Sequence, residues 1–357
     1  MTRTTSLDHY RLLGRSGLRV SPLALGAMTF GADWGWGAEA DEARRIFDAY
    51  VDRGGNFIDT ANQYTNGSSE RLLGEFLGEK RDRLVVATKY TLATRERDPN
   101  SGGNHRRSMV RSVEDSLKRL RTDYIDLLYL HAWDFTTPVD EVLRAMDDLV
   151  RAGKLVYVGV SDIPAWQVSR MQTIADLRGW SPLIALQIEY NLIERTVERD
   201  LIPMAREMGL GVIPWSPLAS GVLTGKYSRA DLDAGSGVGE PTGTRKNVAA
   251  AQNSLHARGL AIADVVKEVA AEMGKTPAQT ALAWTLRNPA VTAPIIGART
   301  LKQLEDNLGA LDVEFSDAQA KKLDQTSAIE LGFPHEMLMR PMTQAVVFGG
   351  MKIEQRL

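Results

Sequence analysis

The segment GNFIDTANQY, residues 55–64, joins a short apolar run to two groups that can carry a proton. The run ends in the carboxylate of Asp59, and Tyr64 follows five residues later. Two more apolar runs, LVVATK (84–89) and IDLLYLH (125–131), end in a lysine and a histidine. In a parallel α/β barrel the C-terminal ends of all strands open onto one face, where catalytic residues collect. The pattern therefore predicts one shared site at that face of a parallel sheet.

Short apolar runs of this kind alternate with longer helical patterns along the chain. The predicted strands are residues 23–28, 56–59, 84–89, 125–131, 156–161, 183–187, 211–215 and 292–296. The predicted helices are residues 41–53, 68–77, 106–120, 139–152, 165–177, 196–208, 265–273, 277–287 and 301–308. Runs that are apolar on both faces are typical of a parallel sheet covered by helices. Eight such units favour an α/β fold of the closed (β/α)8 TIM barrel type over an open doubly wound sheet.

The parts of the chain around these units complete the predicted organisation. The segment YRLLGRSGLRV has the pattern of an N-terminal β-hairpin, residues 10–21, that turns at Arg15 and Ser16. Nothing marks a second domain, so residues 1–357 are predicted to form a single domain with its barrel over residues 22–310.

Two further segments interrupt the alternation of strands and helices. Residues 216–259 form a long loop after the seventh strand, rich in Gly, Ser, Thr and Ala. Loops of this length are functional or disordered. Residues 329–357 form a C-terminal tail with an apolar, Met-rich composition and no role in the barrel. We expect the tail to help shape a substrate pocket.

Composition excludes several classes of partner and site. The formal net charge of -2 favours neither a nucleic acid nor an acidic membrane surface. The absence of cysteine removes disulfides, thiolate zinc sites and a cysteine nucleophile, and the five histidines show no metal-ligand spacing. The sequence contains no run of about 18 apolar residues and no signal peptide pattern. We therefore expect a cytoplasmic protein without a metal site.

Three familiar motifs are absent on inspection. The stretch GAMTFG (26–31) does not fit the Gly-x-Gly-x-x-Gly signature of a Rossmann fold. In GVLTGKY (221–227) the glycines are one residue too close for a P-loop, and Tyr227 stands where Ser or Thr must hold magnesium. The stretch GVSDI (159–163) lacks the second Gly of a nucleophile elbow. These comparisons argue against an ATPase and a serine hydrolase.

The four residues at the strand ends form a consistent proton-donating set: Asp59, Tyr64, Lys89 and His131. A free phenol has a pKa of about 10 and is a sluggish acid near neutrality. A nearby ammonium favours the phenolate, so Lys89 is expected to lower the pKa of Tyr64, while Asp59 keeps Lys89 protonated and oriented. His131 can form a hydrogen bond with a substrate oxygen.

In this order and local context the quartet resembles that of the aldo-keto reductases, which are NADP(H)-dependent carbonyl reductases. The resemblance extends from Leu12 to about Asn307. Within the family, this sequence is more similar to bacterial members and to potassium-channel β-subunits. It implies reduction of a small aldehyde or ketone with NADPH as cofactor and Tyr64 as the acid. Some members act chiefly as NADP(H)-binding regulatory modules of a partner protein and turn over slowly, which remains the alternative. The oligomeric state stays open.

The resemblance also implies a set of cofactor-binding residues at other strand ends. Ser161 and Gln187 match residues that touch the nicotinamide amide, and Trp215 matches the aromatic that stacks on its ring. Asp162 stands where the family most often has Asn, and its carboxylate can only accept a hydrogen bond. The stretch SPLASGVLTGKY (216–227) resembles the loop that clasps the pyrophosphate. The positions carried over from this loop are Ser216, Leu218, Ser220, Gly221 and Lys226.

The stretch IGARTLKQLEDN (296–307) resembles the family's adenosine-phosphate site. Gly297 and Arg299 lie at its start, and Gln303 and Asn307 would face the adenine side. Arg299 would pair with the 2′-phosphate through two parallel hydrogen bonds. No acidic residue lies between Gly297 and Gln303 to prefer a free ribose hydroxyl. The segment therefore favours NADP(H).

Loops form the entrance of such a site, so the sequence constrains the identity of the substrate only weakly. The candidate lining residues share aromatic side chains that follow early strand ends. They are Phe30, Trp34, Trp36, Tyr90, Trp133 and Phe135. This set predicts a fairly apolar carbonyl substrate.

Overall fold

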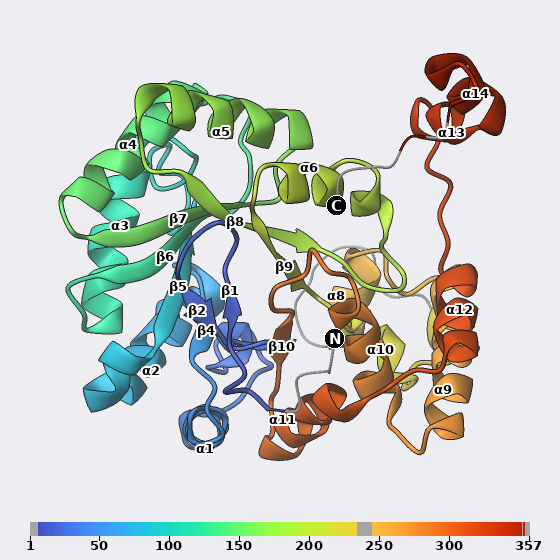
Figure 1. The fold of residues 1–357 in the computed structure, drawn as a ribbon. Coiled ribbons are helices and arrows are strands. Elements are labelled where there is room, and N and C mark those ends of the chain that lie inside the picture. The colour runs from blue at the N-terminus through green and yellow to red at the C-terminus, as the bar shows by residue number, and fades with distance from the viewer. Residues whose placement is uncertain (1–5, 234–244, 352, 354–357) are drawn as a thin grey trace.

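The computed structural model describes residues 6–233, 245–351 and 353. Within them, eight parallel strands form one sheet in the order β10-β3-β4-β5-β6-β7-β8-β9. The strands are β3 (Ala24–Gly26), β4 (Phe57–Asp59), β5 (Val85–Tyr90), β6 (Ile125–Leu130), β7 (Leu155–Ser161), β8 (Leu183–Glu189), β9 (Gly211–Trp215) and β10 (Ile295–Gly297). Helices surround this sheet, as Figure 1 shows, so the predicted (β/α)8 barrel is confirmed.

The barrel closes less regularly between β9 and β10 than between its other strands. These two strands are not paired as a ladder, and a single bridge joins Val212 to Val291. Thr292 N donates to Val212 O at 2.8 Å, and Val212 N donates to Ala290 O at 3.2 Å. Pro294 has no N–H to continue a ladder, so β10 begins three residues later than the predicted strand.

The predicted N-terminal hairpin is present and fills the barrel from below. Strands β1 (Arg11–Leu12) and β2 (Arg19–Val20) pair antiparallel, and Arg15 N donates to Gly209 O at 2.7 Å. Gly14 has φ 55°, and a Cβ there would clash with the backbone oxygen of Ile184. Leu13 is fully buried inside the barrel with inward-facing residues of other strands, among them Phe57. The hairpin therefore seals one end and leaves the carboxyl ends of the strands open.

Most helices follow the predicted pattern because their apolar residues recur on one face. In α1, for example, Ala43, Ile46, Phe47 and Tyr50 are all buried. The helices around the barrel are α1 (Ala40–Asp52), α2 (Ser68–Leu77), α3 (Arg106–Leu120), α4 (Val139–Arg151), α5 (Ala165–Arg178), α6 (Leu201–Glu207), α9 (Ala257–Glu272), α10 (Pro277–Leu286), α11 (Leu301–Leu308) and α12 (Asp317–Thr326).

Three of these helices differ from the prediction, two in their bounds and one in having no predicted counterpart. The predicted helix 196–208 divides into the 3-10 turn η4 (Thr196–Glu198) and α6. Helix α9 begins eight residues earlier than predicted, because the His256 side chain caps it by accepting from Gly259 N. Helix α12 was not predicted, although Ser316 and Gln319 form a capping box at its start.

The long segment after β9 is partly structured. It contains the 3-10 turn η5 (Ala219–Thr224) and the short helices α7 (Arg229–Asp233) and α8 (Arg245–Ala251). Residues 234–244 of this segment lie outside the described residues.

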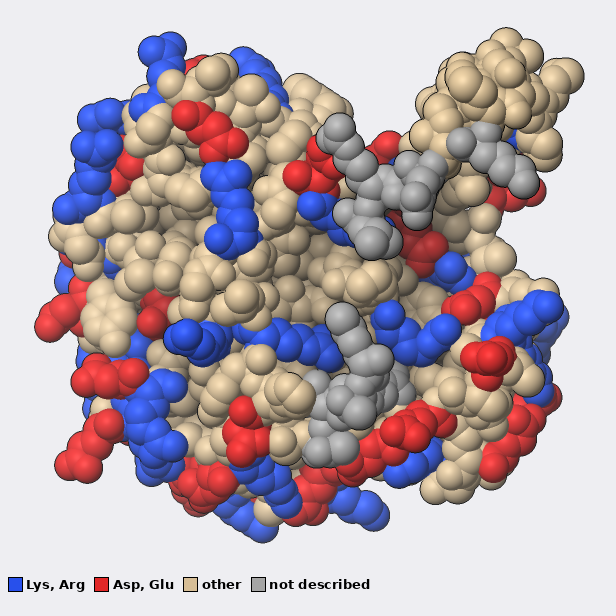
Figure 2. Space-filling view, in the orientation of Figure 1, with Lys and Arg blue, Asp and Glu red and all other residues tan. Residues whose placement is uncertain are grey.

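The C-terminal tail stands apart from the barrel. It forms α13 (His335–Met339) and α14 (Pro341–Phe348), which Figure 1 shows set off beyond α6 and α12. Neither helix has a buried residue, and Val346 is 79% exposed. Figure 2 shows this part of the surface as largely free of charged side chains. Arg199 holds the start of the tail by donating to Glu330 O.

Candidate functional site

The four predicted catalytic side chains meet at the carboxyl end of the barrel. Asp59 ends β4, Lys89 is next to last in β5, and His131 directly follows β6. Lys89 Nζ lies 2.5 Å from Asp59 Oδ1 and 3.2 Å from Tyr64 Oη. The rings of Tyr64 and His131 meet edge to face, with centroids 5.7 Å apart. Parallel pairing thus brings together groups that are far apart in sequence.

A strained turn after β4 places Tyr64. In η2 (Tyr64–Gly67) Thr65 has φ 45°, in the left-handed region. Thr65 Oγ1 donates to Phe30 O at 2.8 Å and accepts from Ser69 N at 3.0 Å. These two bonds hold the backbone in a conformation that a β-branched residue rarely adopts. The Tyr64 ring is thereby fixed against Trp34, with centroids 6.3 Å apart.

Lys89 is a buried cation whose three donors are all used. Its side chain is 0% exposed, and its third contact is Thr60 O at 2.9 Å. An ammonium has three N–H donors, so none is left unpaired. Burial disfavours its charge, but Asp59 and Tyr64 outweigh burial, and the pKa of Lys89 is raised above its ordinary value. The residue therefore stays charged at neutral pH.

Gln187 holds the other oxygen of the Asp59 carboxylate. Its Nε2 donates to Asp59 Oδ2 at 2.8 Å, and both side chains are buried. A carboxylate that accepts from an ammonium and an amide is fixed in orientation. Gln187, predicted as a cofactor residue, therefore also positions Asp59.

The pKa of Tyr64 moves in the direction opposite to the one expected. Burial raises it most, Lys89 lowers it, and Asp59 raises it again, so the net shift is upward. Lys89 acts as predicted, but in the protein alone burial has the larger effect. Tyr64 is therefore a protonated phenol at neutral pH.

His131 is a neutral imidazole. Burial and the charge of Lys89 place its pKa well below the ordinary value. Its Nδ1 is enclosed and has no hydrogen-bond partner among the described residues. The ring can therefore exchange a hydrogen bond with a substrate oxygen without carrying charge.

A cavity of about 630 Å³ opens beside the quartet. Asp59, Tyr64 and His131 line it, and Lys89 lies behind them. All thirteen predicted cofactor residues line the same cavity: Ser161, Asp162, Gln187, Trp215, Ser216, Leu218, Ser220, Gly221, Lys226, Gly297, Arg299, Gln303 and Asn307. Its volume is in the range of small-ligand sites.

The cavity wall formed by residues 216–226 contains several residues in left-handed backbone conformations. Ser216, Ser220 and Gly221 have φ 48°, 53° and 93°. Ser220 N donates to Ser216 Oγ at 3.0 Å, and the Ser220 hydroxyl bonds to Gln252. A Cβ at Gly221 would lie 2.7 Å from Lys226 Nζ. Left-handed turns of this kind form anion-binding concavities, here with a lysine alongside.

The far end of the cavity is formed by the start of α11. Arg299 N donates to Gln303 Oε1 at 2.9 Å, and Asn307 Nδ2 donates to Gly297 O at 3.1 Å. These bonds shape the segment internally, and all four residues still line the cavity. Thr300 caps α11 by accepting from Gln303 N. Arg299 therefore sits where a helix begins, which favours anions.

The predicted substrate residues are only partly placed on the cavity wall. Trp34 lines it, and Trp36 packs on Trp34 with centroids 5.7 Å apart. Those that do not line it are Phe30, Trp36, Tyr90, Trp133 and Phe135. Tyr90 is fully buried because side chains alternate along a strand, so Lys89 faces inward and Tyr90 faces the helices.

The other displaced aromatics have similar reasons. Phe30 is fully buried and packs on Phe76 of α2, and Trp133 is buried in the core around α3 and α4. Phe135 lies on the surface and is 74% exposed. No described residue of the tail lines the cavity, so the expectation that the tail shapes the pocket is wrong for this arrangement.

Sequence reasoning missed several lining residues. Gln252 follows α8 in the segment that had been interpreted as a Gly- and Ser-rich loop, and no local pattern marks it. Asp306 of α11 lines the far end of the cavity, where its Oδ1 accepts from Thr276 Oγ1 at 2.9 Å and Gln279 Nε2 at 3.0 Å. The Thr276–Gln279 capping box could have indicated the start of α10, but not its proximity to the cavity.

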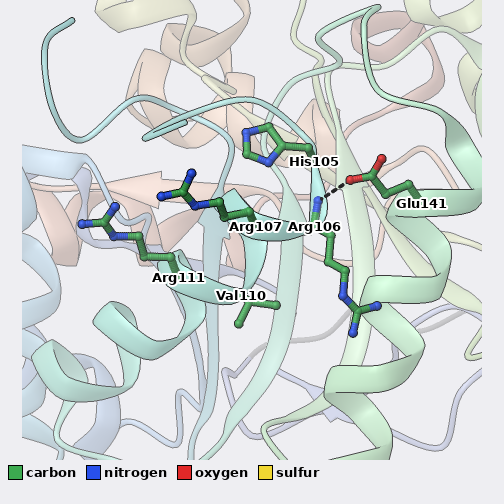
Figure 3. A pocket seen from close by; sticks show the side chains of 6 residues that line it. All are labelled: His105, Arg106, Arg107, Val110, Arg111 and Glu141. Carbon is green, nitrogen blue, oxygen red and sulfur yellow. Dashed lines mark hydrogen bonds between the residues drawn. The ribbon is translucent and has the colours of Figure 1, made fainter. Parts of the chain in front are cut away.

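A second hollow, of about 740 Å³, lies at the start of α3. Figure 3 shows Arg107 and Arg111 along one side and the Arg106 backbone N–H donating to Glu141. The Arg106 guanidinium pairs with Asp148 at 2.5 Å. The hollow shares no lining residue with the cavity of the quartet. Because two of its cations, Arg106 and Arg111, pair with Asp148 and Asp98, and no member of the quartet lines it, we place the candidate site in the other cavity.

Two negative observations apply to the described part of the chain. It contains no group of three or more His, Cys, Asp or Glu residues arranged to hold a metal ion. None of its helices combines the length and apolar character needed to cross a membrane.

Comparison with known proteins agrees with this geometry. The family model "Aldo/keto reductase family" matches residues 22–328. A norsolorinic acid reductase of Aspergillus flavus is 37% identical over 354 residues, covering 96% of this chain and 87% of that protein. An aryl-alcohol dehydrogenase [NADP(+)] of Phanerodontia chrysosporium is 37% identical over 346 residues, covering 92% and 88%.

A bacterial protein also matches most of the chain. The uncharacterized oxidoreductase YrpG of Bacillus subtilis is 39% identical over 316 residues, covering 85% of this chain and 91% of that protein. The region that the family model matches, residues 22–328, includes the barrel and every lining residue named above. This chain is an oxidoreductase that belongs to the aldo/keto reductase family.

Proposed function

We propose that the protein reduces aldehydes or ketones to alcohols with NADPH, reversibly, and that aryl carbonyl compounds are its substrate class. The observation that carries this proposal is the cavity itself. One end holds a protonated phenol 3.2 Å from a buried ammonium, and the other end holds Arg299 beside a helix start. The intact quartet favours an enzyme over a regulatory module.

The lining residues fit a phosphorylated dinucleotide. The Ser161 hydroxyl oxygen is buried at the quartet end without a hydrogen-bond partner among the described residues, as a group awaiting a ligand's amide would be. The left-handed turns of residues 216–221 suit a pyrophosphate. Gly297 leaves open space, since a Cβ there would meet nothing within 4 Å. Ser161, Gln187 and Trp215 would hold the nicotinamide, and Arg299 would hold the 2′-phosphate.

The chain's own part in the reaction is to deliver a proton to the carbonyl oxygen. The bound cofactor supplies hydride to the carbonyl carbon. Tyr64 Oη donates a hydrogen bond to the substrate oxygen and then its proton, because its pKa keeps it protonated. The phenolate that remains lies 3.2 Å from the Lys89 ammonium, which stabilises its charge. Asp59 keeps that ammonium charged and in place.

His131 and the surrounding rings orient the substrate. A neutral imidazole next to Tyr64 can hold the carbonyl oxygen in line with the phenol. Proton transfer of this kind contributes about 10²–10⁴-fold in rate. In the direction of alcohol oxidation the same groups act in reverse.

Two features support aryl carbonyl compounds as the substrate class. Trp34 lines the cavity and meets Tyr64 edge to face, so a flat apolar ring would find an aromatic wall beside the acid. The relatives named above include a norsolorinic acid reductase and an aryl-alcohol dehydrogenase. A carbonyl conjugated to an aromatic ring fits both observations.

A carbonyl screen with purified protein tests this proposal. We expect NADPH consumption with aromatic aldehydes and a higher kcat/KM for them than for alkyl aldehydes of similar size. Trp34→Ala should narrow that difference, while Phe135→Ala, which changes an exposed ring outside the cavity, should not. Tight NADPH binding with no turnover of any carbonyl would contradict the enzyme and favour the regulatory module.

A further inference from the structure

Asp162 is an ionisable group at the reacting end of the cavity. It directly follows β7 with φ 46°, and it lines the cavity. Trp215 Nε1 donates to its Oδ1 at 2.9 Å. Its charge acts on both Tyr64 and Lys89, which places it at the same end as the proton donor. A redox-active ring that reacts beside Tyr64 must therefore lie within the field of Asp162.

The other groups around Asp162 bring little net charge. On β4 and β5, Asp59 and Lys89 form an ion pair whose charges offset each other. Tyr64 and His131 are neutral, for the reasons given above. From β9, Trp215 contributes a neutral donor. Among the cavity-lining residues at this end, the Asp162 carboxylate is therefore the charge that has no ionic partner in the described structure.

One further acidic group faces Asp162 from β8. Glu189 does not line the cavity, and burial together with Glu194 raises its pKa to about 7. The charge of Asp162 also contributes to that shift. Glu189 therefore shares the neighbourhood without contacting the cavity, which makes it a natural control.

We propose that Asp162 sets the balance between oxidised and reduced cofactor, because its carboxylate favours the positively charged nicotinamide of NADP⁺ over the neutral ring of NADPH. The inference rests on the proposed function. Charge near the reacting ring is one of the ways in which a protein tunes a bound cofactor. A ligand that fills the cavity excludes solvent from around the carboxylate, and the lower local dielectric strengthens the attraction.

The same carboxylate makes the balance depend on pH. Although Asp162 is accessible from the cavity, the surrounding protein raises its pKa to about 6. Below that pH it is largely neutral, and the preference for NADP⁺ is lost. Above it the carboxylate is charged, so NADP⁺ affinity relative to NADPH rises through about pH 6 and then levels off. The phosphates are common to both forms and cancel in the ratio.

Measured dissociation constants of NADP⁺ and NADPH between pH 5.5 and 8.5 test this inference. Asp162→Asn keeps an acceptor for the Trp215 indole and removes the charge. We expect it to raise the ratio Kd(NADP⁺)/Kd(NADPH) about tenfold at pH 8 and to make the ratio independent of pH. Glu189→Gln should change the ratio less than about twofold, as its side chain is outside the cavity.

A second measurement uses the unmodified protein and does not depend on the variant folding. Calorimetry in buffers of different ionisation enthalpy should show that NADP⁺ releases about a few tenths of a proton more than NADPH near pH 6. Equal ratios in wild type and Asp162→Asn, a larger effect of Glu189→Gln, or equal proton release would each overturn the inference and leave the proposed function standing. Failure to bind either nucleotide would overturn both.

Discussion

The two ends of the cavity are built in different ways. At the quartet end three of the four side chains come from strand ends and Tyr64 comes from the turn η2. Asp59 and Lys89 are 3% and 0% exposed. Each of their charges has a partner inside the protein. At the other end the groups come from the loop after β9 and the start of α11: Lys226 follows η5, and Arg299 precedes Thr300, which caps α11.

This difference predicts how each end responds to substitution. Removing one member of the quartet leaves a buried neighbour without its partner, so the losses should be large and should not add. Removing a contact at the loop end takes away one interaction with a ligand and leaves the others in place. The losses of ligand affinity should be moderate, and they should affect only ligands that carry the chemical group contacted by the substituted residue.

The largest effect is expected for Tyr64→Phe. It removes the acid and should lower kcat about a hundredfold to ten-thousandfold, with little change in NADPH affinity. Steady-state kinetics and a fluorescence titration measure the two quantities. Tyr10→Phe is a control, because that phenol lies on the N-terminal hairpin and donates to Gly54 O. If Tyr64→Phe kept more than about a tenth of the wild-type kcat, Tyr64 would not be the acid.

The coupling within the quartet is tested by Lys89→Met. We expect a loss of kcat close to that of Tyr64→Phe, and a double variant little worse than either, because both act through one proton-donating unit. The variant also leaves Asp59 buried without its cation, which costs about 3–5 kcal/mol of unfolding free energy. Urea denaturation should show that adding Asp59→Asn to Lys89→Met costs less than the sum of the two single changes. If the double variant instead lost kcat by the product of the two single losses, Lys89 and Tyr64 would not act as one unit.

At the loop end, Arg299→Ala should weaken NADPH about ten- to hundredfold and barely change NADH. A bond from Arg to phosphate contributes about 1.5–3 kcal/mol, which corresponds to this range. Lys302→Ala is the matched control, since this cation lies in α11 but does not line the cavity. Kinetics with both cofactors decides the matter, and equal losses for the two would show that Arg299 does not read the 2′-phosphate.

The smallest effect is expected from removing residues 332–357. No described residue of this segment lines the cavity, and α13 and α14 bury none of their residues. NADPH affinity, the preference among carbonyl compounds and the unfolding midpoint should stay within experimental error of the full chain. A change in substrate preference would instead support the expectation that the tail helps to shape a substrate pocket. The tail would then contact the cavity of its own chain or that of a second copy.

The sequence was informative where a residue's role depends on its position at a strand end. Asp59, Lys89 and His131 each close an apolar run, so parallel pairing alone brings them together. Tyr64 could be added because it lies only five residues beyond the end of β4. Ser161, Gln187 and Trp215 were expected at the site from the family resemblance, and all three line the cavity.

It was less informative where packing decides. Phe30 and Tyr90 are aromatic and close to strand ends, but strand alternation and core packing turn them away from the cavity. The upward shift of the Tyr64 pKa depends on burial, which a list of neighbours does not reveal. Gln252 reaches the cavity only because α8 folds onto η5, and no local pattern encodes that contact.

The single bridge between β9 and β10 gives a mechanical role to the two loops that we propose bind the cofactor. The loop 216–226 leaves the barrel from β9, and the segment 297–307 leaves it from β10, so they flank the one interface of the described sheet that lacks a ladder. A dinucleotide that contacts both segments would link β9 to β10 across this interface and stabilise it. We therefore expect amide hydrogen exchange at Val212 and Thr292, which carry the bridging bonds, to slow most when the ligand binds.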